Sequence, residues 1–119
     1  MSSSTDSPVD WDEFTRQLDE DAELIEILRT MFLESVDEQF EQVEQAVAAG
    51  EAQAIGAAAH TLKGSVAQIF AEQARRLAEA IEAKADGRPS TIESFEQAVE
   101  ELRLQVEAVK AVVSAMGRD

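Results

Sequence analysis

The residues of this chain that could do chemistry lie in a stretch without acidic side chains. Between Glu51 and Glu72 there are 20 residues with no Asp or Glu, although 25 of the chain's 119 residues are acidic. This stretch, AQAIGAAAHTLKGSVAQIFA, contains the only histidine, His60, and three residues later Lys63. In a chain with a net charge of −15, an imidazole and an ammonium without acids between them in the sequence indicate a place that accepts negative charge.

An imidazole can accept a phosphoryl group on a ring nitrogen. Its pKa is ordinarily about 6.5, so it is a good nucleophile near neutral pH. The resulting phosphoramidate is labile and can pass the group on. The added group brings nearly two negative charges, which a lysine three residues along a helix can offset through charge-assisted hydrogen bonds. His60 and Lys63 therefore favour a phosphoryl carrier over a hydrolase.

Other kinds of site find little support. The chain has no cysteine, so disulfides and thiolate metal sites are excluded. A metal site of the Glu-x-x-His type would need an acid at position 57, which is Ala57. Ser65 lies on a different side of the expected helix from His60, and there is no glycine-rich phosphate loop. We expect no metal, no cofactor and no kinase activity of its own.

The composition is that of a globular helical protein. It is 45% hydrophobic and 29% charged, rich in Ala, and has only two Pro and five Gly. The Met1 end does not resemble a signal peptide and no run of 18 apolar residues exists, so we expect a cytoplasmic protein. The net charge of −15 disfavours nucleic acid and anionic membranes as partners.

Apolar spacing predicts one domain over 9–116, between a disordered tail at 1–8 and a short tail at 117–119. A short helix at about 10–18 would open with a capping box of Asp10 and Glu13. A long helix at about 21–49 would end at Gly50. A third helix would span about 52–70. The fourth would follow from Phe70 to 86–89, and the fifth would open with a capping box of Ser90 and Glu93.

Each long helix has an inward stripe spaced by threes and fours. The stripes are Leu24, Leu28, Phe32, Val36, Phe40, Val43 and Val47; Ile55, Ala59, Leu62, Val66 and Ile69; Phe70, Ala74, Leu77 and Ile81; and Phe95, Val99, Leu102, Val106, Val109, Val113 and Met116. This spacing is typical of a left-handed bundle, and short loops make successive helices antiparallel. We predict an all-α fold, an antiparallel up-and-down four-helix bundle with a short additional N-terminal helix.

His60 is predicted to face outward, about 140° from the inward direction of its helix. Its expected surface neighbours are Gly56, Ala57, Lys63 and Gly64, with Gln53 and Ala67 one turn further. A glycine inside a helix costs about 1 kcal/mol relative to Ala, so two of them need a reason. We expect these small residues to leave room for a partner protein beside His60.

The segment Ala59-His60-Thr61-Leu62-Lys63-Gly64-Ser65 resembles the A-H-x-L-K-G-S signature of histidine-containing phosphotransfer (HPt) domains. The resemblance extends over about 9–116, through helix order and the LE-like Ile81-Glu82. The chain departs from the family's pattern at Phe70, where many members have Gly, and at Val66, where a small residue is common.

The resemblance implies that His60 is the phosphoacceptor, that Lys63 steadies the phosphoryl group and that Gly64 leaves room for the partner. Glu82 would stand where some members carry a Gln near the histidine. The implied partners are receiver domains of response regulators and hybrid histidine kinases, whose metal ion belongs to the receiver. The chain would act as a monomeric, free-standing phosphorelay shuttle in two-component signal transduction.

Two other interpretations remain open. The bundle could dock a receiver domain without carrying phosphate, although such proteins generally lack the histidine. Alternatively it could be a structural adaptor in which Gly56, Gly64 and the alanines pack against another helix. That second case predicts a tight oligomer with the His60 face buried.

Overall fold

The computed structural model describes residues 7–116, without the side chain of Met116. The predicted tails at 1–8 and 117–119 therefore lie almost wholly outside the described residues. Within them the chain forms five helices: α1 (Trp11–Gln17), α2 (Ala22–Ala49), α3 (Ala52–Gln68), α4 (Glu72–Ala85) and α5 (Phe95–Met116). No strand occurs in this part of the chain, so the predicted all-α class is confirmed.

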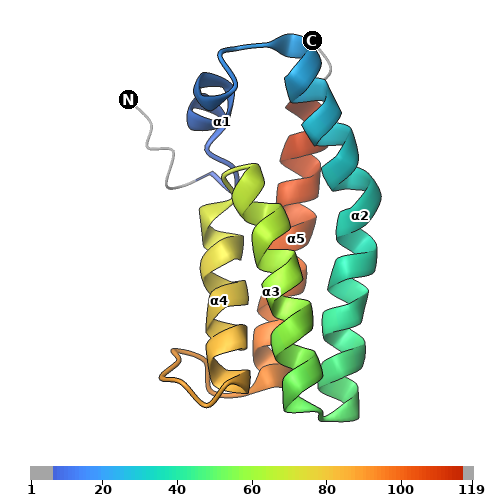
Figure 1. Cartoon of the computed structure of the whole chain (residues 1–119), viewed down its shortest axis with the longest axis vertical. Helices are drawn as coiled ribbons and strands as arrows, with labels where there is room; N and C mark the ends of the chain where they lie inside the picture. Colours follow the sequence, from blue (N-terminus) through green and yellow to red (C-terminus); the bar gives the residue numbers. More distant parts are fainter. Residues whose placement is uncertain (1–6, 117–119) are drawn as a thin grey trace.

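Helices α2 to α5 form a four-helix bundle in which each helix runs opposite to the one before it (Figure 1). The main packing contacts are α2 with α3, α3 with α4, α4 with α5, and α5 back with α2. The short helix α1 lies near the end of the bundle where α3 turns into α4 (Figure 1). This arrangement confirms the predicted up-and-down bundle with an additional N-terminal helix.

Every residue of the predicted α3 stripe is buried. Ala59, Leu62 and Val66 have no exposed surface, and Ile55 and Ile69 have almost none. The α2 stripe is buried at its centre, but Leu24 near its beginning is exposed. There α2 begins beyond the turn between α3 and α4, so less of the bundle can cover it (Figure 1). The stripe of α3 therefore fixes the direction of every other side chain on that helix.

The beginning of α1 forms only half of the predicted capping box. Asp10 accepts a hydrogen bond from the backbone N–H of Glu13, at 3.1 Å. Glu13 does not return the bond: its carboxylate binds Arg16 and Gln17 instead. The N–H of Asp10 donates to the carbonyl of Phe70, at 2.9 Å. The N-cap therefore ties α1 to the turn between α3 and α4.

The predicted extension of α3 to Phe70, and the place of Phe70 in the α4 stripe, are wrong. Phe70 lies in the turn between the helices with a φ of 60°. This left-handed conformation is uncommon for a residue with a side chain, and glycine adopts it most easily. The ring of Phe70 packs near that of Phe14 in α1, with centroids 6.4 Å apart. A bulky residue therefore takes a glycine-like backbone position here and uses its ring to hold α1.

The predicted capping box at the start of α5 is also wrong by four residues. The helix begins at Phe95, and the hydroxyl of Ser94 accepts a hydrogen bond from the N–H of Gln97, at 3.1 Å. Ser90 instead donates its hydroxyl to the carbonyl of Ala80, at 2.6 Å. Both serines precede a Glu or Gln by three residues, so the pattern alone could not decide between them.

Candidate functional site

His60 projects from the outer side of α3, as predicted. Its side chain is 66% exposed, although its neighbour Ala59 and the nearby Leu62 are completely buried. The buried residues hold the helix in place, so the backbone that carries the imidazole has a fixed position. It is therefore accessible to a group carried by another molecule.

The ring of His60 is bonded to a carboxylate from the next helix. Nδ1 of His60 lies 3.1 Å from Oε2 of Glu82 on α4. An ionised carboxylate can only accept hydrogen bonds, so in the neutral ring the Nδ1–H group donates this bond to Glu82. The other nitrogen, Nε2, then holds the lone pair. This bond orients the ring and leaves Nε2 as the nitrogen with a free lone pair.

Lys63 is held by two carboxylates of α4. Its Nζ lies 2.7 Å from Oε1 of Glu79 and 2.8 Å from Oε1 of Glu82. Hydrogen bonds to Glu79, the larger effect, and to Glu82 raise the pKa of Lys63. The bond to Lys63 in turn lowers the pKa of Glu79. Glu82 therefore contacts both the imidazole and the ammonium, and it joins them into one network.

The network continues to the loop after α4. Nη1 of Arg88 lies 3.4 Å from Oε2 of Glu79, and Nη2 lies 3.2 Å from Asp86. Glu79 is therefore shared between two cations, Lys63 and Arg88. The complete network consists of His60, Lys63, Glu79, Glu82, Asp86 and Arg88.

Although residues 52–71 contain no acid, acidic side chains from another helix lie beside this stretch in the folded structure. Because α4 packs antiparallel on α3, it brings Glu79 and Glu82 beside Lys63 and His60. The sequence interpretation gave Glu82 a place only through a family resemblance, and it missed Glu79 and Arg88.

A signal for these contacts was present in the sequence. Two antiparallel helices joined by a short turn place residues at equal distances from the turn side by side. His60 and Glu82 are 22 residues apart and Lys63 and Glu79 are 16 apart, and both pairs are centred on Ala71. Reading the two helices together would therefore have placed both acids at the site.

The two glycines of α3 lie in different surroundings. A Cβ atom on Gly64 would meet nothing within 4 Å, and this residue is exposed, as expected for a surface that a partner could approach. Gly56 is buried instead: a Cβ there would lie 3.2 Å from Oδ1 of Asp86 and 3.7 Å from Ala85. The prediction that Gly56 belongs to an open partner surface is therefore wrong, because that position packs against the end of α4.

The other three residues predicted beside His60 are exposed. They are Gln53, Ala57 and Ala67. With Gly64 they leave a surface of mostly small side chains on the outer side of α3. This surface surrounds His60 with little that would obstruct a second protein.

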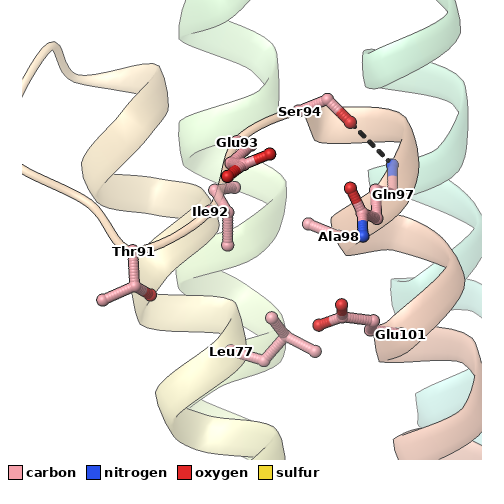
Figure 2. A pocket seen from close by; sticks show the side chains of 8 residues that line it. All are labelled: Leu77, Thr91, Ile92, Glu93, Ser94, Gln97, Ala98 and Glu101. Carbon is pink, nitrogen blue, oxygen red and sulfur yellow. Dashed lines mark hydrogen bonds between the residues drawn. The ribbon is translucent and has the colours of Figure 1, made fainter.

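A separate groove of about 310 Å³ lies between α4, the 90–94 segment and α5 (Figure 2). Its polar side chains include Glu93, Ser94 and Glu101, and the hydroxyl of Ser94 is already used to cap α5. It contains neither His60 nor any other member of the network. The exposed imidazole therefore remains the strongest candidate for chemistry.

Two kinds of site have no support in residues 7–116. No group of three carboxylate or imidazole side chains comes together in a way that could bind a metal ion. Nor does any helix in this range combine the length and apolar character needed to cross a membrane.

Comparison with known proteins gave one match. A family model described as the Hpt domain matches residues 27–112. Neither the curated proteins nor the solved structures gave a match. The matched range includes all of α3 and α4 and the loop with Arg88, so it contains the complete network around His60.

Proposed function

This chain belongs to the Hpt domain family, and from that membership we propose that it carries a phosphoryl group on His60 between receiver-domain aspartates in a two-component phosphorelay. The observation that supports this role most directly is the exposed ring of His60 with its Nδ1 bonded to Glu82. A carrier needs one nucleophilic atom that another protein can reach, and Nε2 fits that need. The chain would act as an intermediate in the relay, without kinase activity of its own.

Because the ring proton is on Nδ1, Nε2 of His60 is the atom that takes part in phosphoryl transfer. The lone pair on Nε2 attacks the phosphorus of an aspartyl phosphate on the receiver. The N–P bond forms, the bond from phosphorus to the carboxyl oxygen breaks, and its electron pair returns to the receiver's aspartate. The reverse reaction passes the group to a second receiver, and the electron pair of the N–P bond returns to Nε2. The Nδ1 proton stays in its bond to Glu82 throughout.

Glu82 and Lys63 support opposite sides of this reaction. As the ring gives up electron density, positive charge develops on it, and the Glu82 carboxylate at 3.1 Å stabilises that charge. The phosphoryl group brings negative charge, which the Lys63 ammonium offsets. Gln53, Ala57, Gly64 and Ala67 would lie against the receiver, with Gly64 leaving room for its active-site loops. In this proposal the chain is a monomer in the cytoplasm, and the domain extends over 9–116.

The test of this role is a phosphotransfer assay. A receiver domain loaded with acetyl phosphate is mixed with the chain, and phosphate that is labile in acid and stable in base is measured on the chain. We expect label on the wild type and none on His60→Gln. Label retained by the variant would remove His60 from the mechanism. Absence of label on the wild type with a broad set of receivers would favour a docking module that carries no phosphate.

Lys63→Ala provides the companion measurement. Lys63 lies off the core stripe, so the variant should keep the helical circular dichroism spectrum of the wild type. Transfer to it should be slower by about tenfold, because the phosphoryl group loses a charge-assisted partner. An unchanged rate would show that Lys63 does not contact the transferred group.

A further inference from the structure

The ammonium of Lys63 is already engaged before any phosphoryl group arrives. Glu79 and Glu82 both hold it at ion-pair distances of 2.7 and 2.8 Å. A phosphoryl group on His60 would bring nearly two further negative charges beside this cluster. The new anion and the two carboxylates would then compete for one cation. The outcome of that competition contributes to how strongly His60 retains the group.

The two carboxylates differ in how easily they can release Lys63. Glu82 is 15% exposed, its Oε1 is shielded from solvent, and its Oε2 is bonded to His60. Leaving that Oε1 atom without a cation would cost the desolvation of a buried charge. Glu79 is 39% exposed, and its carboxylate binds Lys63, whereas the imidazole is bonded to Glu82. Water can therefore solvate Glu79 when Lys63 moves away from it.

Glu79 also has a second cation. Arg88 lies 3.4 Å from its other oxygen, in the loop after α4. When Lys63 turns toward the phosphoryl group, Arg88 keeps the charge of Glu79 partly neutralised. The arrangement supplies both a competitor for Lys63 and a residue that weakens the competitor.

We infer that Glu79 lowers the retention of the phosphoryl group on His60 by competing for Lys63, and that Arg88 moderates this competition. The inference rests on the proposed carrier role. The inference concerns transfer of the phosphoryl group from His60 to the receiver. In this step the N–P bond of His60 breaks, its electron pair returns to the ring nitrogen, and a carboxylate oxygen of the receiver forms the new bond to phosphorus. Glu79 is then a positioning residue: it acts through Lys63 and does not touch the transferred group.

The experiment measures the equilibrium between the phosphorylated receiver and this chain. The probe is a receiver domain loaded with acetyl phosphate, freed of the donor, and chosen because it labels the wild type. The distribution of label at equilibrium gives the equilibrium constant for transfer to His60. For Glu79→Gln this constant should rise about threefold, the size expected for an exposed ion pair. For Arg88→Gln it should fall by about twofold, and Arg88→Lys should restore it.

Two controls separate competition for Lys63 from a general change of charge. Glu72→Gln removes one carboxylate from the same helix, but this carboxylate binds Arg75 and Arg76, so the constant should not change. In a Lys63→Ala background, Glu79→Gln should have no effect, because the contested cation is absent. Circular dichroism checks that each variant keeps its helices.

The outcomes are distinct. If the wild type is labelled but Glu79→Gln leaves the constant unchanged, the inference is overturned while the carrier role stands. If Glu79→Gln raises the constant equally with and without Lys63, simple repulsion explains it and competition is again overturned. If no receiver labels the wild type while phosphoramidate also fails to phosphorylate His60, the carrier role fails and the inference fails with it.

Discussion

At the scale of single residues, Glu82 determines which nitrogen of His60 is available. Its carboxylate accepts a hydrogen bond from Nδ1–H, with Nδ1 and Oε2 3.1 Å apart, and also binds Lys63. A histidine on an ordinary exposed helix surface would have no such partner and could exchange between its two neutral tautomers. In the proposed carrier role, this network therefore defines Nε2 as the nucleophilic atom of an exposed imidazole.

The most direct effect of replacing Glu82 should be on which ring nitrogen of His60 carries the proton. In Glu82→Ala we expect neutral His60 to become a mixture of tautomers, whereas the wild type carries its proton on Nδ1. Nitrogen chemical shifts of the imidazole, measured by NMR at a pH where the ring is neutral, report this directly. Phosphotransfer to the variant should slow by about tenfold, in the range of a lost orienting group.

Glu82→Gln is the matched comparison. Its amide oxygen can still accept a hydrogen bond from Nδ1–H, so the tautomer should remain that of the wild type. Identical nitrogen shifts in the wild type and Glu82→Ala would contradict the assignment of Nε2 as the nucleophile.

At the scale of elements, the turn between α3 and α4 carries a backbone conformation that its residue disfavours. Phe70 has a φ of 60°, and its carbonyl accepts from the N–H of Asp10 while its ring lies near Phe14. A side chain in the left-handed region costs about 1 kcal/mol, whereas glycine adopts it freely. The ring contacts must offset this cost.

Two substitutions separate the ring from the backbone. Phe70→Ala removes the ring and keeps the unfavourable φ, while Phe70→Gly removes both. We expect both variants to be less stable than the wild type, with Phe70→Gly more stable than Phe70→Ala by about 1 kcal/mol. Urea unfolding measures the difference. Equal stability of the two variants would show that the φ of 60° imposes no cost.

The first turn of α4 should contribute a small pH dependence to folding. A hydrogen bond to Arg75, the largest effect, and a second to Arg76 lower the pKa of Glu72 from its ordinary 4.5 to about 2. A carboxyl whose pKa is lower in the folded state stabilises the fold above its unfolded pKa. That contribution is lost as the pH falls through the folded pKa, here from about 4.5 to about 2.

Glu72→Gln tests this contribution. The wild type should exceed the variant in free energy of unfolding at pH 6, by less than about 1 kcal/mol because the pair is half exposed. The difference should vanish as the pH approaches 2. Urea unfolding at several pH values measures it, and a difference independent of pH would contradict the assignment.

The same elements show what the sequence could and could not reveal. The direction of His60 was predictable because one helix's stripe, from Ile55 to Ile69, defines it. The surroundings of Gly56 and the contacts of Lys63 were missed because each helix was interpreted alone, without the pairing about Ala71 and the rotation of α4 against α3 that bring the two helices together. The periodicity of a single helix carries no information about that rotation. The start of α5 was missed because Ser90 and Ser94 offer equivalent local patterns.

At the scale of the whole molecule, one buried cation joins the two long helices that lie farthest apart in the sequence. Arg29 of α2 is 7% exposed, and it is the only charged residue buried within 7–115. Its Nε donates to the carbonyl of Val113 at 2.8 Å, and Nη2 donates to that of Ser114 at 3.3 Å. These carbonyls belong to the last turn of α5, and a basic side chain that binds such carbonyls caps a helix. The guanidinium therefore caps α5 from a different helix.

Removing this cap should loosen the bundle from the end of α5. In Arg29→Met, which keeps the apolar stem, the buried carbonyl of Val113 and the partly buried carbonyl of Ser114 lose a charged donor, so we expect a loss of about 1–3 kcal/mol in urea unfolding. Amide exchange in the last two turns of α5 should accelerate more than exchange at the centre of α3.

Glu26→Gln removes only the exposed acidic partner of Arg29, and it should change stability by less than about 0.5 kcal/mol. Because the His60 network lies on α3, α4 and the loop after α4, Arg29→Met should still accept a phosphoryl group from a receiver at a temperature where it remains folded. An Arg29→Met protein as stable as the wild type would show that water satisfies these carbonyls equally well.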